Sequence, residues 1–112
     1  MEKIKFYQKL IVDFLKEHNF NLRQESELEN EIITDYENGH FQSLTVGWEN
    51  GRHIYKIHFH LDIKPDGKIW IMANNTDTLV AEELLQRGVP KTDIVLGLKP
   101  PYMRSFTGFA VA

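Results

Sequence analysis

The chain has 112 residues, a length that suits a single domain, residues 1–112, with a modest hydrophobic core. Hydrophobic residues make up 42% of the sequence and charged residues 26%, which is ordinary for a globular protein. A net charge of −3 argues against a surface built throughout to attract phosphate. The absence of cysteine excludes disulfides, thiol nucleophiles and thiolate metal sites.

The N-terminal segment predicts a helix. It begins MEKIKFYQKL, which carries charges and lacks an uninterrupted apolar run, so we expect neither a signal peptide nor a membrane span, and a cytoplasmic protein. Between residues 2 and 18, apolar side chains recur at spacings of three and four, which predicts one apolar helix face. That face consists of Ile4, Tyr7, Leu10, Ile11, Phe14 and Leu15. Residues 19–30 are predicted as a loop.

Turn signals between residues 31 and 73 predict a four-stranded antiparallel β-meander. Asn38-Gly39 joins a first strand, near residues 31–37, to a second strand that starts at Phe41. Asn50-Gly51 suits a two-residue type I′ turn, because both residues tolerate positive φ. Lys64-Pro65-Asp66-Gly67 fits a type I turn that closes a bulged three-residue loop before the fourth strand.

The Asn50-Gly51 turn predicts which side chains share a face, since strand residues alternate between two faces. Uninterrupted pairing runs from Glu49 with Arg52 to Gln42 with Phe59, and we expect the face that carries Phe59 to be the core. This predicted core face holds Ile33, Leu44, Val46, Trp48, Tyr55, Ile57 and Phe59. The predicted reverse face holds Ile32, Tyr36, Phe41, Ile54, Trp70 and Met72 among Thr34, Thr45, Lys56, His58, His60 and Asp62. Because this second set is too apolar for open water, we expect the C-terminal tail, a partner chain or a second copy to cover it.

The rest of the chain predicts a second helix and a short final element. Asn74-Asn75-Thr76-Asp77 supplies turn and N-cap residues for a helix over about residues 78–87, and Gly88 suits its C-terminal cap. A short apolar run follows at residues 94–96. Pro100 and Pro101 either open a short helix or stiffen an extended strand. The predicted fold class is α+β, with both helices packed on one face of the meander.

Four segments along the chain carry a family resemblance. They are TVGWENGR, HLDIKPDGKIWI, ELLQRGVPKTDIVLGL and FTGFAVA. Together, and in this order, they resemble the XisI family, whose members are known as controlling factors for excision of the fdxN element. That element is a DNA interruption that site-specific recombination removes during heterocyst differentiation in cyanobacteria. The resemblance implies an accessory role beside a recombinase and a companion called XisH, without established catalysis. It assigns no cofactor and no catalytic or binding residue.

His58-x-His60-x-Asp62 is a pattern with metal-ligand chemistry. Imidazole and carboxylate bind zinc or iron, and alternate strand residues project in the same direction. Three ligands on one strand span about 13 Å, however, so all three rarely meet at one ion. The favoured interpretation is a polar face on which His60 and Asp62 help to define an interface. A small metal-dependent enzyme that uses these three residues is an alternative.

The predicted reverse face is a candidate interface. The expected register places Trp70 opposite Asp62 and Met72 opposite His60, with Phe41 nearby. Aromatic residues and methionine beside polar groups are typical of interface cores. We therefore expect a homo-oligomer or a complex with a protein partner, with cover by the chain's own C-terminal tail as the alternative.

Basic residues occur through the second half of the chain. They are Arg52, Lys56, Lys64, Lys68, Lys91, Lys99 and Arg104. Because acids are interleaved with them, they predict direct DNA contact that is weak and sensitive to salt, with Arg104 among the candidate binding residues. No serine lies in a Gly-x-Ser-x-Gly context and no phosphate-binding glycine loop is present, so we expect no enzyme.

Overall fold

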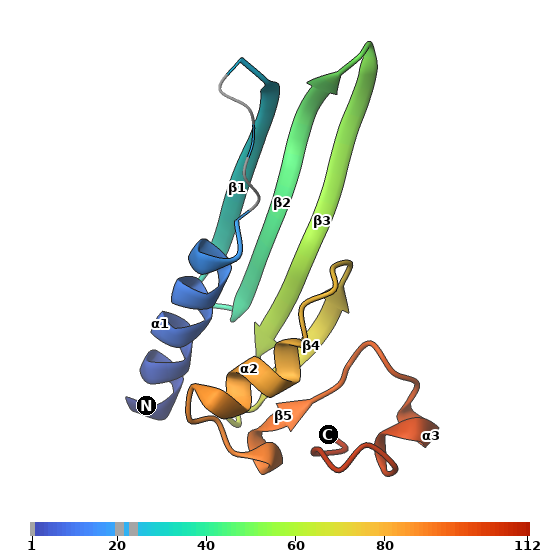
Figure 1. Ribbon diagram of the computed structural model, residues 1–112. Coiled ribbons are helices and arrows are strands. Elements are labelled where there is room, and N and C mark those ends of the chain that lie inside the picture. The colour runs from blue at the N-terminus through green and yellow to red at the C-terminus, as the bar shows by residue number, and fades with distance from the viewer. Residues whose placement is uncertain (1, 20–21, 23–24) are drawn as a thin grey trace.

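A five-stranded sheet with two helices on one face forms the molecule. The computed structural model describes residues 2–19, 22 and 25–112 (Figure 1). The strands are β1 (Glu27–Asp35), β2 (His40–Glu49), β3 (Arg52–Ile63), β4 (Ile69–Asn74) and β5 (Ile94–Val95), and they lie in this order. The helices are α1 (Glu2–Glu17), α2 (Val80–Gln86) and the short α3 (Pro101–Arg104), with a 3-10 turn η1 (Lys91–Asp93) before β5. The α+β class is confirmed.

Helix α1 buries its apolar face against the sheet, as the spacing predicts. Tyr7, Leu10, Ile11, Phe14 and Leu15 are buried and Ile4 packs partly against the same core. The hydroxyl of Tyr7 also donates a hydrogen bond to Oδ2 of Asp93 at 2.6 Å, and Nζ of Lys3 lies 3.0 Å from the same oxygen. Burial opposes ionisation of Asp93, but these two contacts outweigh it and hold the pKa of the carboxyl below its usual value. They tie α1 to the turn that precedes β5.

Two of the predicted turns form as expected. Asn50 and Gly51 adopt φ values of 51° and 75°, and Glu49 pairs with Arg52 across them. At the next turn, the amide of Gly67 donates to the carbonyl of Lys64 at 2.8 Å, and Ile63 pairs with Ile69. At Asn38-Gly39 the loop is longer than predicted, because β1 ends at Asp35. The side chain of Asp35 accepts hydrogen bonds from the backbone and side-chain amides of Asn38, which stabilise this wider turn.

A β-bulge in β3 overturns the predicted faces. Leu44 pairs with Ile57, but Ser43 pairs with Phe59, so His58 is an extra residue between them. One extra residue reverses the alternation of side chains between the two faces. A register that is correct at the Asn50-Gly51 end of the β2–β3 hairpin therefore assigns side chains at the other end to the wrong face. Phe59 lies in the core as predicted, whereas Trp48 and Tyr55 are exposed, at 54% and 63%. The predicted core face is therefore wrong for Ile33, Trp48 and Tyr55, whereas Leu44 is buried as predicted.

The residues that do face the helices form one cluster. The sheet contributes Phe41, Phe59, Leu61, Ile63, Ile69, Ile71 and Ile94. Phe41 is fully buried there and stacks edge to face with Tyr36, so its predicted place on the reverse face is wrong. Ile32 packs against this cluster while Ile33 is exposed, which reverses the prediction for β1 as well. The same bulge explains both, since β1 takes its register from β2.

Two element boundaries and the number of strands also differ from the prediction. Strand β1 starts at Glu27, inside the segment predicted as a loop, because pairing with β2 overrides its alternating glutamates. Helix α2 starts at Val80 without a side-chain cap, since Asn74 and Thr76 bond within the preceding turn instead. The fifth strand, β5, pairs in parallel with β4 and corrects the predicted four-stranded sheet to five. A strand of two residues is too short to show an alternating pattern.

Candidate functional site

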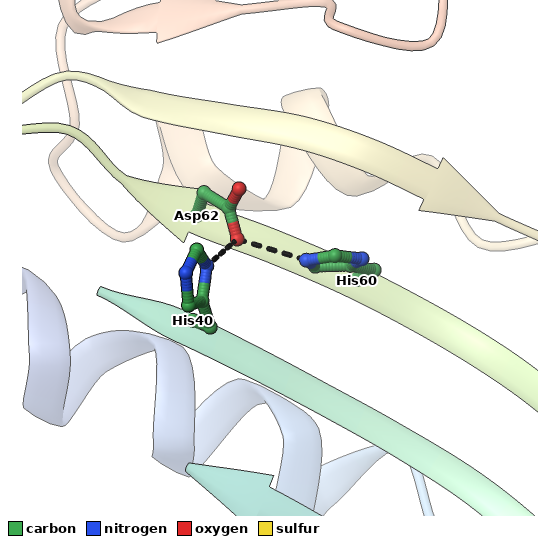
Figure 2. Close-up of side chains that lie close together, drawn as sticks. All are labelled: His40, His60 and Asp62. Carbon is green, nitrogen blue, oxygen red and sulfur yellow. Dashed lines mark hydrogen bonds and ion pairs between the residues drawn. The ribbon is translucent and has the colours of Figure 1, made fainter. Parts of the chain in front are cut away.

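Two histidines and an aspartate meet at one end of the β2–β3 pair. Nδ1 of His40 and Nε2 of His60 both lie against Oδ1 of Asp62, at 2.9 Å and 2.8 Å (Figure 2). One ligand atom from each residue falls within 4.8 Å of the other two. The Asp62 side chain is only 7% exposed, while that of His40 is 52% exposed. We call these three residues the His-Asp cluster. It joins a buried carboxylate to an imidazole that water can reach.

The bulge at His58 builds this cluster. Without the extra residue, His40 would pair with Leu61 and its side chain would point to the helices; with it, His40 pairs with Asp62. Gly39, just before His40, adopts a φ of 76°, and its carbonyl accepts a hydrogen bond from the amide of Ile63 at 2.8 Å. This contact holds the start of β2 against the end of β3. The position of His40 therefore depends on both features.

His58 does not belong to the cluster that the sequence pattern predicts. It is buried, and its Nε2 lies 2.7 Å from Oγ1 of Thr45, which in turn donates to Oδ1 of Asn30 at 2.6 Å. Burial, and then the positive charge of Lys56, lowers the pKa of His58. His60 and Asp62 do lie together, but their third member is His40. Sequence reasoning missed His40 because an uninterrupted register sends it to the opposite face.

The C-terminal segment covers the predicted interface around Trp70. The guanidinium of Arg104 lies 5.0 Å from the centre of the Trp70 ring, and Nζ of Lys64 lies 5.4 Å from it. A Cβ on Gly97 would come within 2.9 Å of Sδ of Met72 and 3.1 Å of the Trp70 ring, so the backbone passes close over both. This is the cover by the chain's own tail that the sequence left as an alternative. Trp70 pairs with Asp62 as expected, but a second bulge places His60 opposite Ala73 rather than Met72.

The other half of the sheet presents an apolar surface with an acidic edge. Strand pairing puts its members on the face that lacks α1 and α2, and we call it the helix-free face. It consists of Glu27, Glu29, Glu31 and Ile33 from β1, Val46 and Trp48 from β2, and His53, Tyr55 and Ile57 from β3, around the buried Leu44. The ring of Trp48 lies 5.1 Å from that of His53. The tip of this β2–β3 hairpin projects beyond α1 (Figure 1), so its side chains reach water.

Two of the basic residues from the sequence pattern lie beside acids. Lys64 lies 4.0 Å from Asp62, and Lys68 lies 3.8 Å from Asp66. Arg52 and Lys56, near the hairpin tip, are exposed. Neutralised cations contribute less to phosphate binding, so Lys64 and Lys68 are weaker candidates for DNA contact than Arg52 and Lys56.

None of the helices in the described ranges is long and apolar enough to cross a membrane. The sequence profile of the XisI protein family matches residues 1–111 of the chain. A solved structure of a XisI-like protein from Anabaena variabilis ATCC 29413 is 42% identical, with a TM-score of 0.90 over 97% of this chain and 99% of that one. The structure of the fdxN element excision controlling factor XisI from the same organism is 30% identical, with a TM-score of 0.82 over 98% and 99%. A search among curated proteins found no match.

Proposed function

Because the chain belongs to the XisI family, we propose that it is a controlling factor for the excision of a DNA element. The observation that carries this proposal is its similarity, over nearly the full length of both chains, to a protein named as the fdxN element excision controlling factor. We further propose that it acts through contacts with a recombinase or an XisH-type companion and not through catalysis of its own. The helix-free face is the surface that we assign to these contacts.

The chemistry of the helix-free face suits a protein partner. Trp48 and Tyr55 are large aromatic side chains that fill pockets at low entropic cost, and such residues often dominate binding energy. Glu27, Glu29 and Glu31 project beside them from the edge strand β1 and are exposed. An apolar centre with an acidic edge favours a partner surface with an apolar patch and basic residues beside it. A second copy of this chain would bring the same acids together, so a hetero-complex is the better fit.

The test is the solution mass by light scattering, for the protein alone and mixed with an XisH-type companion. We expect a stable mixed complex whose affinity falls by roughly 30-fold in Trp48→Ala or Tyr55→Ala, the loss typical of a central aromatic contact of about 2 kcal/mol. Phe106→Ala is the matched control, since Phe106 is exposed at 85% but lies in the C-terminal segment. A protein that stays monomeric in the presence of the companion would contradict the partner proposal.

The salt dependence of binding distinguishes direct DNA contact from contact through a protein partner. If the protein itself binds duplex DNA through Arg52 and Lys56, affinity should fall steeply as salt rises. No shift of labelled duplex at low salt would leave the protein contact as the sole route to DNA.

A further inference from the structure

We propose that the His-Asp cluster binds one divalent transition-metal ion of the zinc type, with His40, His60 and Asp62 as its ligands. This inference concerns the isolated chain and is independent of the partner proposal. The donor set is two imidazole nitrogens and one carboxylate oxygen, which suits zinc, and it is hard to match with magnesium or calcium, which prefer oxygen alone.

The ligand atoms lie close enough for one ion, but their separations must adjust. The two imidazole nitrogens now donate to Oδ1 of Asp62 at 2.9 Å and 2.8 Å. Around a tetrahedral zinc ion with bonds of about 2.0 to 2.1 Å, neighbouring ligand atoms lie about 3.3 Å apart. The two nitrogen–oxygen separations would therefore have to open by roughly 0.5 Å. The two nitrogens, which lie within 4.8 Å of each other, would have to settle at about 3.3 Å. His40 can supply this movement, because its half-exposed side chain rotates without disturbing the core.

The ring nitrogens must present lone pairs to the ion. Each imidazole now turns an N–H toward Asp62, so ligation requires that proton to move to the opposite ring nitrogen. In His60 that opposite atom is Nδ1, which lies 3.4 Å from the side-chain amide of Gln42. When its oxygen turns to the ring, this amide accepts a hydrogen bond from the N–H group at Nδ1. Such an outer hydrogen bond is the usual companion of a metal-bound histidine, since it fixes the tautomer and the ring orientation.

The surroundings of the His-Asp cluster leave a route by which an ion can enter and one coordination position free for another ligand. Asp62 is buried, but the exposed side of His40 faces water, so an ion can enter without unfolding the sheet. Three protein ligands leave the fourth tetrahedral position to water or to a group from another molecule. The ammonium of Lys64 lies by the other oxygen of Asp62, at 4.0 Å, and over the Trp70 ring. It lowers the affinity of the site for a cation without occupying it.

The experiment is calorimetric titration of chelator-treated protein with Zn²⁺. We expect one ion per chain, and a loss of affinity of at least about tenfold in His40→Ala and in His60→Ala, as removal of one of three ligands demands. The matched control is His53→Ala, which removes an exposed histidine from the same strand and should bind Zn²⁺ like the parent protein. Mg²⁺ should give no signal. Far-UV circular dichroism of each variant without metal establishes that it is folded.

A second readout comes from Trp70, which pairs with Asp62. The chain has two tryptophans, so Trp48→Phe leaves Trp70 as the only reporter. Its fluorescence should change on addition of Zn²⁺ with the stoichiometry found by calorimetry, and recover with chelator. The proposal is overturned if the parent protein takes up no Zn²⁺ in either assay. It is equally overturned if His40→Ala and His60→Ala bind as tightly as His53→Ala, because the ion would then lie elsewhere.

Discussion

Gly39 and Gly51 form a natural matched pair for a test of the turn that positions His40. Both adopt nearly the same backbone conformation, with φ of 76° and 75°. A Cβ on Gly39 would lie 2.2 Å from the carbonyl oxygen of Ile63, whereas a Cβ on Gly51 meets no described atom within 4 Å apart from those of its chain neighbours. Alanine at either position pays the cost of positive φ, about 1 to 2 kcal/mol. Only Gly39→Ala adds a collision with backbone.

The collision sets the size of the difference. The shortest contact that a real Cβ tolerates is 3.0 Å, so the chain must separate by most of an ångström at Gly39. Overpacking of this kind costs about 1 to 3 kcal/mol. Loss of the hydrogen bond from the amide of Ile63 to the carbonyl of Gly39 adds about 1 kcal/mol. We therefore expect Gly39→Ala to lower the free energy of unfolding by about 3 to 6 kcal/mol and Gly51→Ala by about 1 to 2 kcal/mol.

Urea denaturation followed by circular dichroism measures both values, with the slope m as a check that the transition stays two-state. This prediction is refuted if the free energies of unfolding of the two variants differ by less than about 0.5 kcal/mol. In that case the loop at Gly39 does not press on Ile63, and this contact does not position His40 beside Asp62.

Two further predictions concern the core and its pH dependence. Phe41→Ala should cost about 3 to 5 kcal/mol because Phe41 is fully buried, whereas Phe106→Ala should stay within about 0.5 kcal/mol; equal urea midpoints for the two would refute the corrected register. Tyr7→Phe removes a hydrogen bond that lowers the pKa of Asp93, so it should cost about 1 kcal/mol at neutral pH. A lowered carboxyl pKa stabilises the fold above the ordinary value of about 3.9, and this contribution is lost as pH falls through the folded pKa. The difference in free energy of unfolding between Tyr7→Phe and the parent should therefore be smaller in urea titrations at about pH 3 than at neutral pH. An equal difference at both pH values would count against this role of Tyr7.

Local signals in the sequence are sufficient to predict the elements that residues close together in the sequence determine. The apolar spacing of α1 and the turns at Asn50-Gly51 and residues 64–67 are each decided within a few positions, and all three were predicted correctly. The resemblance to the XisI family was likewise confirmed by the family profile and by two solved structures.

The bulge at His58 could not be predicted, because it depends on the partner strand. No residue type marks it: His58 is not a glycine, and its neighbours continue a regular strand pattern. A single unrecognised residue then reversed the faces of Phe41, Trp48 and Tyr55 and removed His40 from the candidate site. His60 and Asp62 lie beyond the bulge on the same strand, and for this reason the prediction that they share a face was correct.

The two ends of the β2–β3 hairpin have different roles. Its base contributes to the stability of the fold, whereas its projecting tip presents a surface. Neither α1 nor α2 reaches its tip (Figure 1), so opening of the strand ends there costs much less than global unfolding, and amide hydrogens near Asn50 should exchange early. The amides of β3 next to Phe59 and Leu61 should exchange only when the whole domain unfolds. Residues at the tip can therefore change without endangering the fold. Substitutions at the tip would alter the surface that the chain presents and leave its folding core unchanged.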